Sequence, residues 1–322
     1  MPTKTKAAKV SQAASADLAA LVGRMRGGDR RATSRVVTEL ERLSPDLPAL
    51  LKELGPHLGH ALIVGFTGPP GAGKSTLVNA YTSHLRQAGK SVGIIAVDPS
   101  SPVSGGAILG DRIRMSATLD DDGVFMRSLA NRGHLGGLCP AAVRVIDGLD
   151  AAGKDAILLE TVGTGQSEID VAEVADVRVV VMAPGLGDDI QAMKAGLLEI
   201  ADIMVVNKAD REGADRALHQ LTGAASLRAG PRAKVPVLKT TATTGEGVAA
   251  LVEAIAAAAA RLQVDHRQRR RRRARYLIAR AAADLVSERI RAGQDRGLDA
   301  LADQVLAGQL LPAAAARKLL GK

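Results

Sequence analysis

The sequence predicts a three-layer α/β fold, in which a mostly parallel β-sheet is covered by helices on both faces. Short, continuous apolar runs alternate with helix-like segments between residues 61 and 262. Such runs are typical of strands that are buried on both faces. A glycine-rich loop, GPPGAGKS at residues 68–75, follows the first apolar run and precedes a helical segment. This order of strand, loop and helix is the context that a phosphate-binding loop needs.

Each expected strand is a short run rich in Val, Ile and Leu, and helical segments separate most of them. The expected strands are residues 61–66, 91–98, 123–129, 155–161, 177–183, 203–208 and 235–241. An alanine-rich helix at 247–262 is expected to close this domain. We therefore predict a helical N-terminal arm at 1–60, an α/β domain at 61–263 and a helical C-terminal extension at 264–322.

Composition limits the classes of protein to which the chain can belong. Of its 322 residues 46% are hydrophobic and only 1% aromatic, so Ala, Val, Leu and Ile must build the core. The single cysteine, Cys139, excludes an intrachain disulfide and fits a reducing cytoplasm. No apolar run approaches the roughly 18–20 residues of a membrane span. We therefore expect a cytoplasmic protein without a membrane segment.

The loop at 68–75 has the residues that bind nucleotide phosphates. Glycines at 71 and 73 let backbone N–H groups point inward, and the following helix adds positive potential at its N-terminus. Lys74 is expected to reach the β- and γ-phosphates, and the Ser75 hydroxyl to bind Mg²⁺. The expected phosphate-binding residues are Gly68, Pro69, Gly71, Ala72, Gly73, Lys74, Ser75 and Thr76.

A second motif, NKAD at 207–210, indicates that the base is guanine. The Asp210 carboxylate can accept hydrogen bonds from the guanine N1–H and amino group, a donor pair that adenine lacks. Asn207 can contact the base N7 and hold the neighbouring loop, while the Lys208 stem packs on the ring. The backbone at Thr241 and Ala242 is expected to contact the guanine O6. The predicted ligand is GTP, with GDP as product.

Three acids are candidates for the metal site and for hydrolysis: Asp98, Asp111 and Glu160. Glu160 begins the sequence Glu160-x-x-Gly163, where Ras-like GTPases have D-x-x-G, and the Gly163 N–H could sense the γ-phosphate. A carboxylate here can bind Mg²⁺ through water or orient the attacking water. For Asp98 a simple strand-end acid, and for Asp111 a surface charge, remain as alternatives.

With these residues assembled, the chain resembles the MeaB/ArgK-type GTPases. The resemblance rests on GPPGAGKST, AVDPSSPVSGGAILGDRIRM, FMRSLANRGHLGG, ETVGTGQSE, APGLGDDIQAMKAG and NKAD, which cover roughly residues 61–210. It implies a P-loop GTPase fold of the SIMIBI class and carries the metal and catalytic roles onto Asp98, Asp111, Glu160 and Lys74. It also implies a switch loop at 183–194 with Asp188, Gln191 and Lys194.

The resemblance further implies a homodimer that chaperones adenosylcobalamin-dependent methylmalonyl-CoA mutase and gates cofactor loading. Intrinsic hydrolysis should be slow, because no arginine finger is evident in the chain. Some members have an older label as transport-linked kinases. A P-loop metabolic kinase is therefore the alternative, against which NKAD argues because kinases more often use ATP.

A run of arginines dominates the formal charge of +9, since eight of them and no acid lie within residues 267–280. Nucleic-acid binding is disfavoured, because the run is too dense for one helix face and has no interleaved aromatic residues for base stacking. We expect a solvated helix start or a docking face for an acidic partner.

Overall fold

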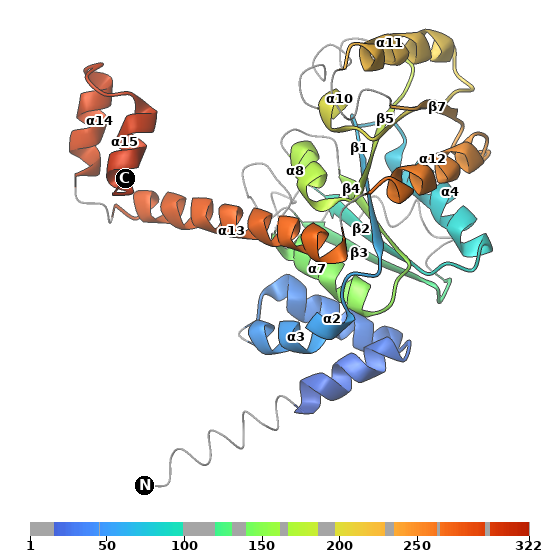
Figure 1. Ribbon diagram of the computed structural model, residues 1–322, viewed down its shortest axis with the longest axis horizontal. Coiled ribbons are helices and arrows are strands. Elements are labelled where there is room, and N and C mark those ends of the chain that lie inside the picture. The colour runs from blue at the N-terminus through green and yellow to red at the C-terminus, as the bar shows by residue number, and fades with distance from the viewer. Residues whose placement is uncertain are drawn as a thin grey trace. The chain divides into compact units, whose positions relative to one another are not determined.

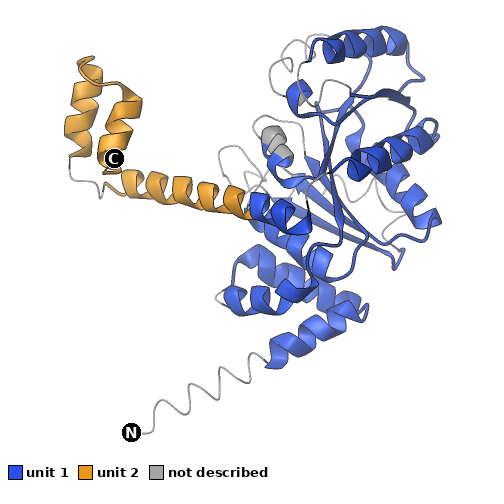
Figure 2. Ribbon diagram, in the orientation of Figure 1, with its two compact units in different colours: residues 1–273 blue, residues 274–322 orange. Residues whose placement is uncertain are grey.

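The computed structural model describes residues 16–44, 46–98, 120–130, 140–161, 167–185, 197–228, 235–262, 265–293 and 297–321. The chain forms two compact units, residues 1–273 and residues 274–322, which Figure 2 colours separately. The larger unit contains the sheet, and the described elements of the smaller one are helices joined by turns.

The sheet confirms the predicted fold class, and all of its strand pairings are parallel. Its seven strands lie in the order β3-β2-β4-β1-β5-β6-β7 (Figure 1). The strands are β1 (Leu62–Thr67), β2 (Val92–Asp98), β3 (Val124–Ala130), β4 (Ala156–Thr161), β5 (Val177–Met182), β6 (Ile203–Asn207) and β7 (Val237–Thr240). Each lies within a predicted apolar run or within one residue of it.

Helices cover both faces of this sheet. Successive residues of a strand point to opposite faces, so the apolar strands have side chains to bury on each. On one face, α4 (Lys74–Gln87) and α12 (Val248–Ala260) pack on side chains such as Val64, Phe66 and Ile94. On the other, α10 (Leu197–Ile200) and α11 (Ala214–Ser226) pack on Met182 and Met204.

The remaining covering helices of that second face approach the sheet at glycines. In α8 (Ser167–Val174), Val171 lies where a side chain at Gly65 would have to be. In α7 (Pro140–Ala151), Leu149 lies in the same way against Gly93. These close approaches hold both helices tightly on the sheet.

The N-terminal arm is helical, as predicted, and packs on α7. Residues 16–26, α2 (Arg30–Arg42) and α3 (Leu47–Leu54) are helices, followed by the 3₁₀ turn η1 (Gly55–His57). A turn at residues 27 and 28 separates the first two helices, and the Asp29 carboxylate caps α2 by accepting from two backbone N–H groups. Leu40 of α2 packs against Gly148 of α7.

The arginine run belongs to a long helix, α13 (His266–Arg291), and part of it is bound within the larger unit. Arg269 Nη1 donates to Asp176 Oδ2 at 2.7 Å, and Arg272 Nη2 donates to the Ala175 carbonyl at 2.7 Å. Arg273 is only 4% exposed and lies 3.9 Å from Asp176 Oδ1. The expectation of a solvated or partner-docking run is therefore wrong for these three arginines.

The smaller unit comprises the rest of α13 with α14 (Leu298–Leu306) and α15 (Pro312–Leu319), which confirms that the C-terminal extension is helical. Large apolar side chains on it are exposed, among them Leu285, Leu306 and Leu311. Among the described residues, no helix is both long and apolar enough to cross a membrane.

Candidate nucleotide-binding site

The phosphate-binding loop joins the carboxyl end of β1 to α4, as predicted. Its glycines 68, 71 and 73 have φ values of 141°, 77° and 85°, a region that side chains rarely adopt. A Cβ on Gly68 would lie 2.0 Å from the Val181 carbonyl oxygen, and one on Gly73 would lie 2.4 Å from Asn207 Nδ2. A side chain would therefore clash at Gly68 and Gly73, and at Gly71 the positive φ alone favours glycine.

Lys74 lies inside the loop as the first residue of α4. Its side chain is buried, and Nζ donates to the carbonyl oxygens of Gly68 and Pro69 at 2.9 Å each. The ammonium group is thus held over the loop, beside the N-terminus of α4. A phosphate bound in the loop would interact with this positively charged ammonium group and with the backbone N–H groups of the loop.

A hydroxyl and a carboxylate meet beside the loop, at the start of α4 and the end of β4. Ser75 Oγ donates to Glu160 Oε1 at 2.6 Å, and both residues are buried. The register places Glu160 next to Phe66 of β1 and Ala96 of β2. Mg²⁺ prefers oxygen ligands of this kind, so these two side chains fit a magnesium site at the phosphate end of the loop.

Asp98, another of the three predicted acids, is the last residue of β2, and β2 pairs with β4. Its backbone is therefore at the same edge of the sheet as Glu160. The other predicted residues of the metal site and switches lie outside the described residues: Asp111, Gly163, Asp188, Gln191 and Lys194.

Asn207 connects the two halves of the site. Its Nδ2 donates to the carbonyl oxygens of Ala72 at 2.9 Å and Gly73 at 3.3 Å. Its Oδ1 accepts from Thr240 Oγ1 at 3.1 Å and from the Ala242 N–H at 3.2 Å. The predicted role of holding the neighbouring loop is thus visible. The contact of Asn207 with the base N7 stays a prediction.

The other residues of the NKAD motif lie at the mouth of the site. Lys208 has a φ of 59°, and its Nζ donates to the Gly71 carbonyl at 2.6 Å, so its stem crosses beside the loop. Asp210 is exposed, as a residue that receives a diffusing base must be. The segment after β7 bends back, with an N–H···O bond of 3.0 Å from Thr241 to Glu246.

Sequence reasoning missed one pair in the site. Thr161 Oγ1 donates to Thr67 Oγ1 at 3.2 Å, and both threonines are buried. They end β4 and β1, directly behind the loop, and tie the two strands that carry Glu160 and the loop. Only the sheet order could have revealed them, because the two residues are 94 positions apart.

The comparisons with known proteins agree with this geometry. The family model described as "Methylmalonyl Co-A mutase-associated GTPase MeaB" matches residues 33–295. The chain belongs to the MeaB family. It is a GTPase of that family, and the family implies that it binds GTP.

Individual relatives of this MeaB-family chain cover most of its length. A protein of Pyrococcus horikoshii is 52% identical over 239 residues, which are 73% of this chain and 75% of that protein. GTPase ArgK of Escherichia coli is 43% identical over 199 residues, 61% of this chain and 60% of the relative. A solved structure titled as an LAO/AO transport system kinase has a TM-score of 0.74 at 26% identity, covering 95% of this chain and 97% of that one.

Proposed function

We propose that this GTPase is a chaperone of an adenosylcobalamin-dependent methylmalonyl-CoA mutase, which it protects and whose cofactor loading it gates. The observation that supports the proposal best is the match of residues 33–295 to a family described by its association with that mutase. The buried Ser75–Glu160 pair supports GTP hydrolysis as part of this function, because it supplies metal ligands at the phosphate end of the loop.

In this proposal the chain's own residues divide the work of binding and hydrolysis. Lys74 and the loop N–H groups hold the phosphates, and Asp210 selects guanine. Ser75, Glu160, Asp98 and Asp111 would hold Mg²⁺, which, when bound, neutralises charge on the β- and γ-phosphates. Asn207 holds the base-binding segment next to the phosphate loop through hydrogen bonds to both. The phosphate then passes to water rather than to an acceptor.

Partner and assembly are part of the same proposal. The switch residues Asp188, Gln191 and Lys194 would report the nucleotide state to the mutase. The protein would act as a cytoplasmic homodimer joined through its C-terminal helices. The exposed leucines of the smaller unit support this, because large exposed apolar side chains on a helical unit favour association.

One experiment separates the chaperone from the alternative kinase. GTP turnover is measured alone, with the mutase from the same organism, and with arginine or ornithine as acceptors. We expect slow phosphate release without acceptor and at least about a tenfold increase with the mutase. Turnover that strictly requires the small-molecule acceptor, with no response to the mutase, would establish the kinase instead.

A further inference from the structure

A cavity of about 490 Å³ lies in the larger unit, at the opposite end of the sheet from the phosphate loop. It opens where β1 and β4 begin, beside Leu62 and Asp155, whereas the loop follows the end of β1. Its volume is in the range of cavities that hold small ligands. No residue assigned to the nucleotide site lines it.

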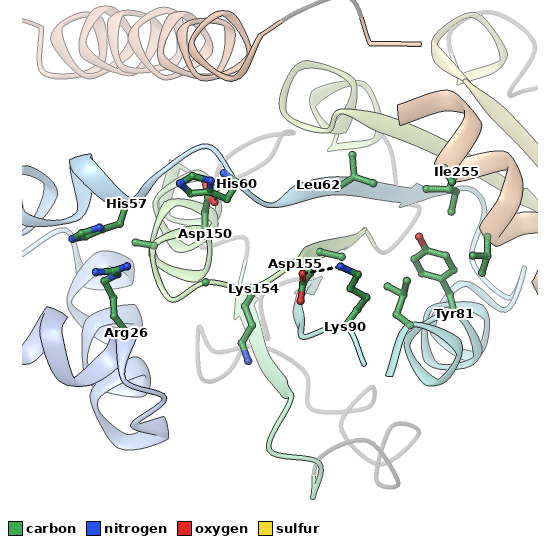
Figure 3. A pocket seen from close by; sticks show the side chains of 16 residues that line it. Arg26, His57, His60, Leu62, Tyr81, Lys90, Asp150, Lys154, Asp155 and Ile255 are labelled. Carbon is green, nitrogen blue, oxygen red and sulfur yellow. Dashed lines mark hydrogen bonds and ion pairs between the residues drawn. The ribbon is translucent and has the colours of Figure 1, made fainter. Parts of the chain in front are cut away.

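The two ends of this cavity differ in chemistry. One end is an apolar slot between α4 and α12, formed by Leu62, Leu85, Val252 and Ile255. Figure 3 shows the guanidinium of Arg26 beside the imidazole of His57 at the other end. An elongated cavity with one apolar and one basic end is complementary to an amphipathic anion.

Tyr81 places an unused polar group in the apolar slot. The residue is only 3% exposed, and its hydroxyl makes no hydrogen bond with any residue that the structure describes. Burial raises its pKa, so the hydroxyl stays a neutral donor. Figure 3 shows it directed toward the space between Leu62 and Ile255. Because Tyr81 lines the cavity, a ligand with an acceptor oxygen in the slot would receive the hydrogen bond that this hydroxyl can donate.

The charges that line the cavity leave Arg26 available for an anion. The Asp150 carboxylate accepts from the backbone N–H groups of Gly59, His60 and Ala61 at 2.6–3.0 Å. Asp155 pairs with Lys90 at 3.3 Å, a bond drawn in Figure 3. Within the described parts of the chain, Arg26 makes neither an ion pair nor a side-chain hydrogen bond.

We propose that this cavity binds an amphipathic monocarboxylate whose apolar chain carries an oxygen acceptor. The carboxylate lies at Arg26 and His57, the chain fills the slot between α4 and α12, and the oxygen accepts from Tyr81 Oη. This binding site is separate from the nucleotide site and does not depend on the proposed chaperone function.

The test uses octanoate and a set of oxooctanoates with the keto oxygen at successive carbons, titrated calorimetrically into the full-length protein. At least one oxo isomer should bind about five- to tenfold more tightly than octanoate, the effect of one added buried hydrogen bond. In Tyr81→Phe this preference should disappear while octanoate binding remains. In Arg26→Ala both probes should bind about five- to tenfold more weakly.

A site-specific signal locates the ligand. The chain has only two tyrosines, Tyr81 and Tyr276, so fluorotyrosine labelling gives two ¹⁹F resonances, which Tyr276→Phe assigns. The preferred probe should shift the Tyr81 resonance and leave that of Tyr276 unchanged. Arg31→Ala, an exposed arginine outside the cavity, is the matched control and should bind like the wild type.

The outcomes that overturn the proposal are equally specific. Absence of saturable binding for every probe at millimolar concentration would do so, as would binding that is the same in wild type, Arg26→Ala and Tyr81→Phe. Basal GTP turnover and circular dichroism verify that each variant is folded. Because Arg26 is exposed, its variant keeps the test decisive even if Tyr81→Phe fails to fold.

Discussion

Ser75 Oγ lies 2.6 Å from Glu160 Oε1, which brings a helix-start hydroxyl and a strand-end carboxylate together in a buried space. The residues are 85 positions apart, and the adjacency of β1 and β4 brings them together. Both oxygens are suited to a hard divalent cation. The pair links the phosphate loop to the strand that leads toward the expected γ-phosphate sensor.

Glu160→Gln should lower the rate of GTP hydrolysis by at least roughly 10- to 100-fold, the effect of changing even an outer-shell residue of a metal site. The amide keeps the size of the side chain but removes its charge. GTP affinity in EDTA should stay unchanged, while the Mg²⁺ concentration needed for half-maximal turnover should rise. Asp155→Asn, just before the opposite end of β4, is the control and should keep the wild-type rate. An unaltered rate in Glu160→Gln would contradict the assigned role.

Asn207→Ala should loosen the site and destabilise the fold. It removes four hydrogen bonds, three of them buried, which join the phosphate loop to the end of β7 and the segment after it. We expect a loss of about 2–3 kcal/mol in the free energy of unfolding and at least about a tenfold loss in GTP affinity. Urea denaturation and calorimetry measure the two. Lys208→Ala, which removes one partly exposed bond to Gly71, should have the smaller effect on stability.

Asp210→Asn should change which base the site prefers. The amide can no longer accept two hydrogen bonds from guanine, so GTP affinity should fall at least about tenfold. The affinity for xanthosine triphosphate should fall less or rise, because the C2 carbonyl of this base can accept a hydrogen bond from the new amide. Competition against a fluorescent nucleotide gives both affinities. Because Asp210 is exposed, the melting temperature should not change; equal losses for both nucleotides would refute base selection by this residue.

Asp176→Asn should destabilise the larger unit by about 3 kcal/mol, because it leaves Arg269 and the buried Arg273 without a carboxylate. Urea unfolding of the variant at neutral pH measures the loss. Asp122→Asn, which changes an exposed aspartate on the same unit, should change the free energy of unfolding by less than about 0.5 kcal/mol. Similar stability in the two variants would mean that the arginines do not depend on Asp176.

Asp121 should make stability depend weakly on pH. A hydrogen bond from Arg86, at 2.9 Å, and one from the Gly123 N–H lower the pKa of this carboxyl. A lowered pKa in the folded state contributes stability above the unfolded value, near 4, and loses it as pH falls through the folded value. Asp121→Asn should therefore cost under about 1 kcal/mol at pH 7. The difference from wild type should shrink below about pH 4, which urea titrations at several pH values would show.

Much of the fold is readable from the chain, because strands buried on both faces have to be continuous apolar runs. β1, β4 and β6 are of this kind, and their polar ends at residues 67, 160 and 207 mark the edge where the site forms. The glycine conformations of the phosphate loop follow from the motif alone.

What could not be read depends on contacts between distant segments. The sequence assigns Asn207 to the base and to the neighbouring loop, but it does not show that Asn207 Nδ2 donates to Ala72 and Gly73, 135 and 134 residues away. The arginine run has the composition of a solvated helix, yet Arg273 is buried beside Asp176, the residue just before β5. The cavity that Tyr81 lines corresponds to no sequence motif, since its lining residues come from several helices and strand ends.

The attachment of Arg269, Arg272 and Arg273 to residues 175 and 176 has a practical consequence for anyone who divides this protein. A fragment that stops at residue 263 would keep Asp176 with the Ile63 amide at 3.1 Å but remove Arg269 and Arg273. A negative charge would then be left buried without compensation. Chimeras that exchange the C-terminal unit between relatives should be joined after Arg273, so that both sides of this contact come from the same parent.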